Sequence, residues 1–453
     1  MSLDFEMLLR NLFEVGVAAA SPSVQMPVVW KNRILPWLNQ VAPERQRVWV
    51  FGAGKAAASM AKALEDAADG HAGASSGSQE QLQGFVITRQ GYGLPTRCVE
   101  VREASHPVPD QRGQQAALEM LQALSNVPHD EPVIVLVSGG GSSLLSTPEP
   151  GITFEELQSL NRGLLSAGTP ISEINTVRKH VSASLGGKMA RACKAPIFQV
   201  IISDVPGDDP SVVASGPFCP DSSTYSDALA VLARWDVLAA ESIVKHLCSG
   251  VSGLFEETPK AGDRVFERLE TCLLASASTM LNAVSDRLEQ QGYHVLSLGD
   301  TLEAESRDVA AVHAAMVKQV CRSQKNWPKA PLAIVSGGEC SVTLPAHSLG
   351  KFNGGRNTEF LLALVCQLAG FDTECPIAAM AADTDGTDGL GEQAGALMLP
   401  GDNERARVAG LNARKYLDRH ATADYFDGLG RLLTTGPTQT NVNDLRVILI
   451  GEP

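Results

Sequence analysis

The sequence predicts an α/β protein made of two units that face a shared cleft. Three observations lead to this prediction. The chain has 453 residues, which suggests two or three domains. Short β-branched runs alternate with longer helical patterns, as expected of strands joined by crossover helices. An apolar run that breaks into glycine and serine, residues 132–145, has an echo at residues 332–341, so the same loop design occurs in both halves.

Composition narrows the class of protein. The formal net charge is −14, which argues against nucleic-acid binding because that function needs a basic surface. The first thirty residues carry acidic and polar breaks without a cleavage-site pattern, and no run of eighteen apolar residues occurs. The nine cysteines show no paired C-x-x-C spacing. We therefore expect a cytoplasmic protein with free thiols that binds neither nucleic acid nor membranes.

The first glycine loop follows the β-branched run at residues 132–138. Gly139, Gly140 and Gly141 let the backbone approach a ligand closely. Ser142 and Ser143 then open a helix, whose positive end attracts an anion. The loop predicts phosphate or carboxylate binding, and a tight strand-to-helix turn that serves packing alone is the alternative.

A second strand-to-helix loop lies at residues 52–58. It places Lys55 in the first turn of an alanine-rich helix, where a cation is unfavourable unless an anion binds there. A solvated lysine is the alternative. Gly52, Gly54 and Ala57 also approach a dinucleotide fingerprint. Since the next strand ends in Arg89 instead of an acidic residue, only an NADP version of that fingerprint is compatible.

Residues 171–193 predict a helix with a polar stripe that includes Asn175 and Lys179, flanked by Arg178. This stripe suits the approach of an anion, and a solvated face is the alternative. Gly186 and Gly187 would then interrupt or bend the helix.

The strand at residues 195–203 ends at Asp204, where ligands of open parallel sheets bind. Its carboxylate suits a magnesium ligand or a base for a hydroxyl proton.

The second half repeats these features after a boundary expected near residues 250–262. The echo loop holds Gly337, Gly338 and Glu339. Arg356 and Asn357 open a helix after a double glycine, and an arginine at that position again indicates an anion. Asp385 follows another strand, and Asn443 precedes the last one; magnesium, substrate hydroxyls and turn formation all remain open for them.

The motifs carry a resemblance to a known family. SHPVPD, VSGGGSSLL, NTVRKHVSASLGGKMA, ISDVPGDDPSVVASGP, VSGGE, GGRNTEF, AADTDGTDG and TGPTQTNVNDL occur in this order. Together they resemble the class II glycerate kinase family, whose C-terminal part is the MOFRL domain. The resemblance implies two Rossmann-like α/β domains with mostly parallel sheets and a deep cleft between them. We expect these domains at residues 1–250 and 251–453, with the MOFRL region at about 332–450.

The resemblance also implies an activity. It is the transfer of the γ-phosphoryl of ATP to the 2-hydroxyl of D-glycerate, with magnesium, to give 2-phosphoglycerate and ADP. Lys55 and Arg356 match the family cations regarded as catalytic, and Asp204 matches the aspartate of the ISDVPGDDP motif. Phe352, Asn353, Thr358 and Gln439 depart from the pattern that we expect of the family, which bears on substrate contacts more than on the reaction.

These arguments give one set of expected site residues. The expected catalytic residues are Lys55, Arg356, Asp204 and Lys179, with Asp204 also the candidate magnesium ligand. The expected binding residues lie in the loops and strand ends described above: Gly139, Gly140, Gly141, Ser142, Ser143, Asn175, Arg178, Gly337, Gly338, Glu339, Asn357, Asp385 and Asn443.

The expected partners are D-glycerate and ATP, bound by a monomer or a homodimer. Two alternatives stay open: an NADPH-dependent hydroxypyruvate reductase, indicated by the fingerprint at residues 52–57, and a non-catalytic sugar-acid sensor.

Overall fold

The computed structural model describes residues 4–71, 81–322, 327–344, 352–371, 373–389 and 391–453. The chain divides into two compact units. The first-sheet unit comprises Pro22–Ser203 and Asp208–Leu274. The second-sheet unit comprises Met1–Ser21, Asp204–Gly207 and Ala275–Pro453. Each unit has its own sheet and its own core, and each is described separately.

The first sheet has six strands in the order β3-β2-β1-β4-β5-β6. Its strands are β1 (Arg47–Ala53), β2 (Gln81–Arg89), β3 (Val99–Ala104), β4 (Val133–Ser138), β5 (Ile197–Ile202) and β6 (Leu269–Ala275). Pairs β1–β2, β2–β3, β1–β4 and β4–β5 are parallel, which confirms the prediction of a parallel sheet. This is the order of doubly wound nucleotide-binding sheets, with the reversal of strand order between β1 and β4.

Helices pack on this sheet and on one another. The helices α2 (Pro22–Val29) and α3 (Leu35–Val41) are joined by the π-helical turn η1 (Trp30–Ile34), and α2 packs on α4 (Ala57–His71). The helix α4 lies against β1, β2 and β4, while α5 (Gln111–Asn126) lies against β2 and β3. Short helical turns complete the unit: α6 (Gly141–Leu144), α9 (Lys188–Ala192), η2 (Val213–Ser215) and η3 (Arg264–Phe266).

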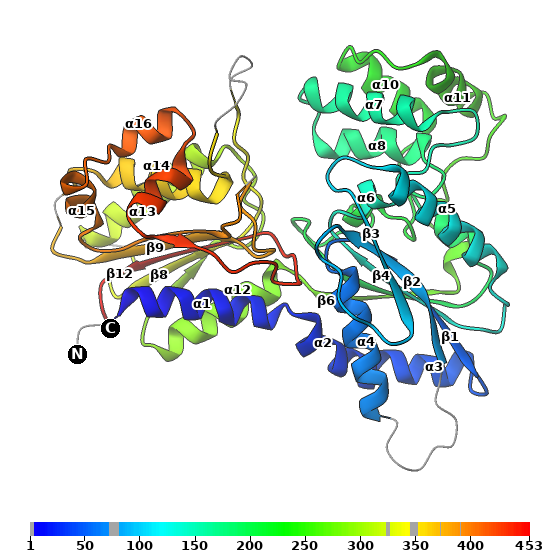
Figure 1. Ribbon diagram of the computed structural model, residues 1–453, viewed down its shortest axis with the longest axis horizontal. Coiled ribbons are helices and arrows are strands. Elements are labelled where there is room, and N and C mark those ends of the chain that lie inside the picture. The colour runs from blue at the N-terminus through cyan, green and yellow to red at the C-terminus, as the bar shows by residue number, and fades with distance from the viewer. Residues whose placement is uncertain (1–3, 72–80, 323–326, 345–351, 372, 390) are drawn as a thin grey trace. The chain divides into compact units, whose positions relative to one another are not determined.

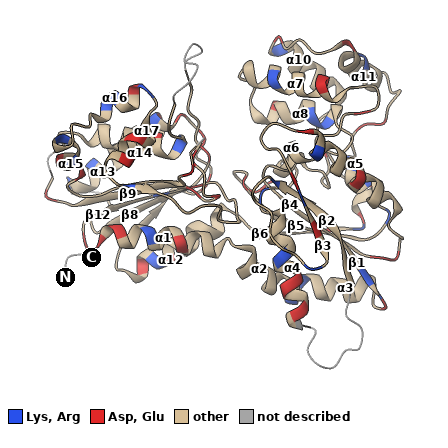
Figure 2. Ribbon diagram, viewed as in Figure 1, with Lys and Arg blue, Asp and Glu red and all other residues tan. Residues whose placement is uncertain are grey.

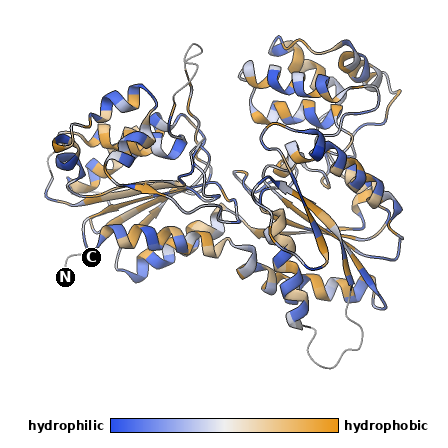
Figure 3. Ribbon diagram, in the orientation of Figure 1, coloured by the Kyte–Doolittle hydropathy of each residue, from blue (hydrophilic) through white to orange (hydrophobic). Residues whose placement is uncertain are grey.

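Four helices form a separate hydrophobic cluster in the same unit. They are α7 (Phe154–Ser166), α8 (Ile171–Val181), α10 (Tyr225–Arg234) and α11 (Glu241–Val251). Its buried members include Leu160, Val177 and Leu247. Figure 3 shows hydrophobic residues along the strands and on one side of these helices. The cluster holds α8, which carries Asn175, Arg178 and Lys179, in a fixed position.

The second sheet has the order β11-β10-β9-β12-β8-β7. Its strands are β7 (His294–Ser297), β8 (Leu332–Ser336), β9 (Ile377–Asp383), β10 (Gly395–Met398), β11 (Leu432–Leu433) and β12 (Asp444–Ile450). Only β7 and β8 pair in parallel; the other four pairs are antiparallel. The expectation of a mostly parallel second sheet was therefore wrong, because β12 inserts between β8 and β9 and runs opposite to both.

Helices cover both faces of the second sheet (Figure 1). The helices α13 (Ser306–Cys321) and α14 (Arg356–Leu368) lie on one face, while α1 (Phe5–Ala19) and α12 (Ala277–Gln290) lie on the other. The remaining helices are α15 (Asp402–Val408), α16 (Ala413–Asp418) and α17 (Thr422–Gly428). The core includes Phe360, Leu364 and Ile448.

The unit boundaries differ from the predicted division at residue 250. The strand β6 belongs to the first sheet, so residues up to Leu274 stay with the first-sheet unit. The N-terminal helix joins the second-sheet unit instead, because Gly16 lets α1 lie close to α12. A Cβ atom at Gly16 would lie 2.9 Å from Cγ of Met280. Neither shift could be inferred from local sequence patterns.

Residues 5–41 form a helical stretch that is long and apolar enough, by length and composition alone, to cross a membrane. Helices that form the core of a folded protein pass the same test. In α1, Leu9, Leu12 and Phe13 are buried within the second-sheet unit. Figure 2 shows Lys and Arg scattered among Asp and Glu on the helices of both units.

Candidate functional site

The two glycine loops of the first-sheet unit meet where its strand order reverses. The loop after β1 and the loop after β4 are tied together, because the Lys55 N–H donates to Gly139 O at 2.9 Å. The Ala56 N–H donates to Ser138 Oγ at 3.0 Å. Ligands of open α/β sheets bind outside the carboxyl ends of the strands at such a reversal. The predicted residues of these two loops therefore lie together.

The side chains of His106 and Lys55 both lie against the backbone of Gly140. Gly140 has φ +81°, and a Cβ atom there would lie 3.0 Å from His106 Nε2 and 3.2 Å from Lys55 Cγ. A side chain at residue 140 would crowd both neighbours and would strain the left-handed backbone, so glycine suits this position. Lys55 lies in the turn that precedes α4, two residues before the first helical residue, and not in the first turn as expected. His106 was not among the expected site residues, and the structure brings it into this group.

Gly52 and Gly54 are explained by packing between strands. A Cβ atom at Gly52 would lie 2.2 Å from Leu136 O, and one at Gly54 would lie 2.1 Å from Ser138 Oγ. Both glycines therefore admit β4 and its loop. In a dinucleotide site, the first of these glycines permits a tight turn and the second lets the backbone approach the pyrophosphate. This difference weakens the fingerprint that suggested NADP.

The helix α8 presents Asn175 and Arg178 from beside these loops. It ends at Val181, before the glycine pair at which we expected the interruption, and α9 starts at Lys188. The Asn175 side chain accepts a hydrogen bond from Ser215 Oγ at 2.9 Å. The Arg178 Nε donates to Asn161 Oδ1 at 2.8 Å. Burial lowers the pKa of Arg178 to about 10. Among the described residues Arg178 forms no ion pair, so its charge is available to an anion.

Lys179, on the same helix, already has an anionic partner. Only 8% of the residue is exposed, and its Nζ lies 3.3 Å from Asp221 Oδ1. Although burial alone raises the pKa of Asp221, the Lys179 charge and the Ser223 hydrogen bonds lower it overall. The alternative of a solvated polar stripe is wrong for Asn175 and Lys179, because both side chains are buried.

Arg356 of the second-sheet unit is held by three carboxylates. Its guanidinium donates from Nε to Asp444 Oδ1 at 2.8 Å, and from its two terminal nitrogens to Glu339 at 2.9 Å and Asp383 at 2.8 Å. Although burial alone lowers the pKa of Arg356, these carboxylates raise it well above its usual value. Arg446, another neighbour of Asp444, is fully buried. Sequence reasoning did not identify Asp383 or Asp444 as partners of Arg356, nor Arg446 as a second partner of Asp444.

Backbone N–H groups in the first turn of α14 donate hydrogen bonds to a carboxylate of the same unit, that of Asp388. Asp388 accepts from the backbone N–H groups of Asn357 and Thr358, each at 2.9 Å, and from Thr358 Oγ1 at 2.8 Å. Burial raises the pKa of Asp388 despite these donors. The Asn357 Nδ2 atom donates to Asp444 at 2.7 Å, while its buried Oδ1 has no partner among the described residues. These N–H groups are thus already bonded.

Asp204 and Asn443 lie together in the second-sheet unit. The Asp204 carboxylate accepts from Asn441 Nδ2 at 3.1 Å, and its backbone carbonyl accepts from Asn443 Nδ2. Asn443 has φ +63°, which is uncommon for a residue other than glycine. Among the described residues, no group of three or more acidic, histidine or cysteine side chains is arranged to hold a metal ion. Magnesium commonly needs only one or two carboxylates beside substrate phosphates, so Asp204 fits that role.

The echo loop does not form a second strand-to-helix glycine loop like the one at residues 139–143. Residues 337–344, the described part of the chain after β8, contain no helix. A Cβ atom at Gly338 would lie 2.4 Å from Leu302 O, so this glycine is needed for packing. The Gly337 carbonyl accepts from Arg446 at 2.7 Å. Asp385 forms a turn in which its Oδ1 accepts from the Thr387 N–H at 2.8 Å. The expected resemblance between residues 139–143 and 337–341 is therefore limited to sequence.

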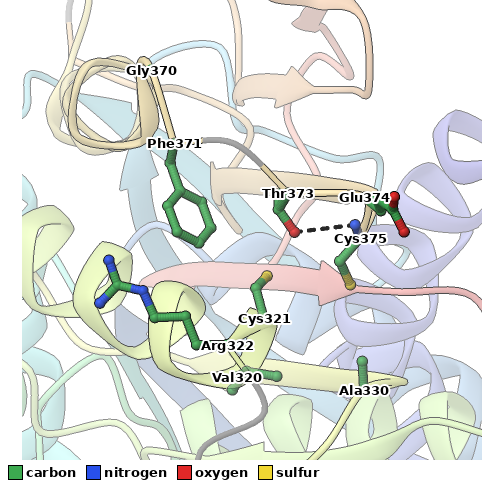
Figure 4. A pocket seen from close by; sticks show the side chains of 9 residues that line it. All are labelled: Val320, Cys321, Arg322, Ala330, Gly370, Phe371, Thr373, Glu374 and Cys375. Atoms are coloured by element: carbon green, nitrogen blue, oxygen red, sulfur yellow. Dashed lines mark hydrogen bonds between the residues drawn. The ribbon is translucent and has the colours of Figure 1, made fainter.

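Two pockets of the second-sheet unit differ in their relation to these residues. A pocket of about 650 Å³ is lined by Val320, Cys321, Arg322, Ala330, Gly370, Phe371, Thr373, Glu374 and Cys375 (Figure 4). It contains none of the predicted site residues. A smaller one of about 290 Å³ lies beside Arg356 and is lined by Cys340, Phe352, His420 and other residues. Of these two pockets, only the smaller one adjoins a predicted site residue, Arg356.

Comparisons with known proteins found matches in both halves of the chain. A family model described as a domain of unknown function (DUF4147) matches residues 8–248, and the MOFRL family model matches residues 332–444. A protein of Agrobacterium vitis named "Putative hydroxypyruvate reductase" is 42% identical over 98% of this chain and 94% of its own. The glycerate 2-kinase of Pyrococcus horikoshii is 35% identical over 89% of this chain and 87% of its own.

A solved structure is also similar. The crystal structure of a glycerate kinase from Thermotoga maritima matches with a TM-score of 0.80 and 32% identity. The match covers 98% of this chain and 99% of that one. The similarity therefore extends over both units.

Proposed function

Because the chain belongs to the glycerate kinase family with a MOFRL domain, we propose that it transfers the γ-phosphoryl group of ATP to the 2-hydroxyl of D-glycerate. The products are ADP and 2-phosphoglycerate. The observation that carries the proposal is the pair of loops, with Lys55, Gly139 and Gly140, at the strand reversal of a sheet of nucleotide-binding order. Phosphoryl transfer depends mainly on positioning and on positive charge around the transferring group.

The residues of the first-sheet unit suit the anionic groups of the substrates. Lys55 lies at the glycine loop, and Arg178 has a charge that no described carboxylate neutralises. The proposal assigns phosphoryl or carboxylate oxygens to Lys55, Arg178 and the backbone N–H groups of the glycine loop. Lys179 acts less directly in this proposal, because Asp221 already neutralises its charge.

Arg356 and Asp204 have roles set by their neighbours. Three carboxylates fix the Arg356 guanidinium, so its remaining exposed edge would meet substrate without rearrangement. Asp204 would hold magnesium together with the phosphates of ATP. When bound, the metal neutralises phosphate charge. The Asn441 and Asn443 amides orient Asp204 for this role.

Glycerate-dependent formation of ADP tests the proposed function. Purified protein with magnesium-ATP should release ADP when D-glycerate is added and much less without it. The proposal would be contradicted if D-glycerate did not raise the rate of ADP release above the rate with ATP alone. The assay should contain enough protein for the ATP-only rate to be measured readily.

One relative supports a second candidate function, because it carries the name of a hydroxypyruvate reductase. The dinucleotide fingerprint that would support it is accounted for by strand packing at Gly52 and Gly54. Consumption of NADPH in the presence of hydroxypyruvate, without magnesium or ATP, would favour the reductase over the kinase.

A further inference from the structure

A chain of buried hydrogen bonds fixes the direction in which one serine of the glycine loop can bond to a ligand. Ser142 Oγ lies 2.8 Å from Ser215 Oγ. Ser215 Oγ in turn donates to Asn175 Oδ1 at 2.9 Å. A hydroxyl has one hydrogen, and that of Ser215 is given to Asn175. Ser142 must therefore donate its own hydrogen to Ser215.

The neighbouring serine is oriented in the same sense. Ser143 Oγ donates to Gly140 O at 3.1 Å. Both hydroxyl hydrogens thus point into the protein, while both residues remain partly exposed. Only the oxygen lone pairs of Ser142 and Ser143 are left for a ligand. These oxygens can accept hydrogen bonds but cannot donate to a phosphate or carboxylate oxygen.

Ser215 has an unusual backbone conformation. Ala214, Ser215 and Gly216 have φ values of 52°, 57° and 57° in succession. A left-handed conformation costs about 1–3 kcal/mol for a residue other than glycine, and such residues cluster at functional sites. Ser215 is fully buried, and the 214–216 turn is bonded to the glycine pair after α8: Ser215 O accepts from the Gly186 N–H at 3.0 Å.

The same turn also presses on the glycine loop. A Cβ atom at Gly141 would lie 2.6 Å from Ala214 Cβ, so the loop and the turn fit together only with glycine there. Ser215 therefore connects the glycine loop, α8 and the 186–187 turn in one position.

We propose that Ser142 and Ser143 accept hydrogen bonds from the hydroxyl groups of the polyhydroxy-acid substrate, with Ser215 and Asn175 as positioning residues. The inference rests on the proposed function, and it identifies the serine pair as the part of the site that recognises hydroxyl donors. The nearby Arg178 would take the carboxylate of the same substrate. The backbone N–H groups of the loop remain the donors for anionic oxygens.

The test measures binding and so does not depend on turnover. Calorimetric titration compares D-glycerate with D-lactate and 3-hydroxypropionate, each of which lacks one hydroxyl group. Wild-type protein should bind D-glycerate about tenfold more tightly than at least one of the two analogues, as expected for one neutral hydrogen bond. Ser142→Ala or Ser143→Ala should remove that preference by weakening D-glycerate and leaving the analogue unchanged.

Variants of the positioning residues sharpen the test. Ser215→Ala and Ser215→Gly should both reduce the preference, although glycine relaxes the left-handed backbone and alanine does not. Asn175→Asp keeps an acceptor for Ser215 and should retain the preference, whereas Asn175→Ala should not. Ser146→Ala is the matched control, because that buried hydroxyl donates to Ser142 O at 3.0 Å and faces the protein.

Two results would overturn the inference. One is an unchanged preference in both Ser142→Ala and Ser143→Ala, and the other is equal binding of all three acids by the wild type. Failure of the proposed function has a different signature: D-glycerate binds with the expected preference, but ATP is not converted to ADP.

Discussion

The two units hold their cations in opposite ways. In the second-sheet unit, Arg356 is surrounded by Glu339, Asp383 and Asp444, and its charge is fully compensated before any ligand arrives. In the first-sheet unit, Arg178 is held only by the neutral Asn161 among the described residues, and burial lowers its pKa. Arg356 is thus fixed in place, but its charge is already neutralised by its carboxylate partners. Arg178 keeps a charge that a ligand can neutralise, and burial of that charge lowers the stability of the unliganded protein.

This difference shows that a cation at a helix start does not by itself identify an anion site. Arg356 opens α14 as the sequence predicts, but Asp388 closes the same turn and three carboxylates surround the guanidinium. Substitutions in both units can test whether, in solution, Arg356 is the rigidly held cation and Arg178 the cation with an unneutralised charge.

Arg356→Ala should have the largest effect, because it removes both a catalytic charge and a structural one. If Arg356 contacts the transferring group, turnover should fall about 10³-fold or more. Removal of the guanidinium also takes one ion-pair partner from the buried carboxylates of Asp383 and Asp444, which should cost about 3–5 kcal/mol of unfolding free energy. Steady-state kinetics and denaturant unfolding measure the two effects. A stable variant with less than a tenfold loss of turnover would contradict both roles.

Lys55→Ala should lower turnover about 10³-fold with little change in stability. The side chain lies against the glycine loop and is only half-buried, so its removal should not open the core. Lys62→Ala, on the exposed side of α4, is a control that should keep full activity. If Lys55→Ala were as unstable as Arg356→Ala, the proposed contrast between the two units would be lost.

Asp221→Asn should lower the stability of the first-sheet unit by about 3–5 kcal/mol at neutral pH, since Lys179 then lacks its carboxylate partner. The pKa of Asp221 is lowered in the fold from its ordinary 3.8, so the ionised carboxylate stabilises the protein above that pH. The contribution should be lost as pH falls through the folded pKa. Thermal unfolding of both proteins from pH 7 to pH 3 should therefore show the wild-type advantage shrinking only in acid. A constant difference would refute the ion-pair account.

Arg178→Met should raise thermal stability while it weakens substrate binding. A pKa lowered from 12.5 to about 10 corresponds to an upper limit of about 3 kcal/mol for the strain of burying this charge. We expect a gain nearer 1 kcal/mol, because the Asn161 hydrogen bond is lost. Sulfate should stabilise the wild type more than the variant in melting experiments. A less stable variant with unchanged D-glycerate affinity would show that Arg178 is structural.

The sequence predicts much of the fold because the relevant signals are local. The run before Gly139 is a buried strand, and α14 begins at Arg356, as predicted. The antiparallel pairs of the second sheet depend on where β12 inserts, which is a non-local property.

The site was less predictable for the same reason. The loop residues Lys55 and Gly140 carry a local signal and do lie together. His106 and Ser215 in the first-sheet unit, and Asp444 in the second-sheet unit, contact predicted residues that are distant in sequence, so no local pattern distinguishes them from ordinary loop residues. The double glycine at 337–338 is the opposite case. Its local pattern matches a ligand-binding glycine loop, but close packing of Gly338 against Leu302 explains the need for glycine there.

Phosphorus NMR of the reaction with D-glycerate, ATP and magnesium tests the central claim most directly. The spectrum distinguishes 2-phosphoglycerate from 3-phosphoglycerate and follows ADP in the same sample. We predict the 2-phosphoglycerate signal, growing in equal amount with ADP. ATP that remains intact, in a sample of folded protein that consumes NADPH with hydroxypyruvate, would contradict the kinase account.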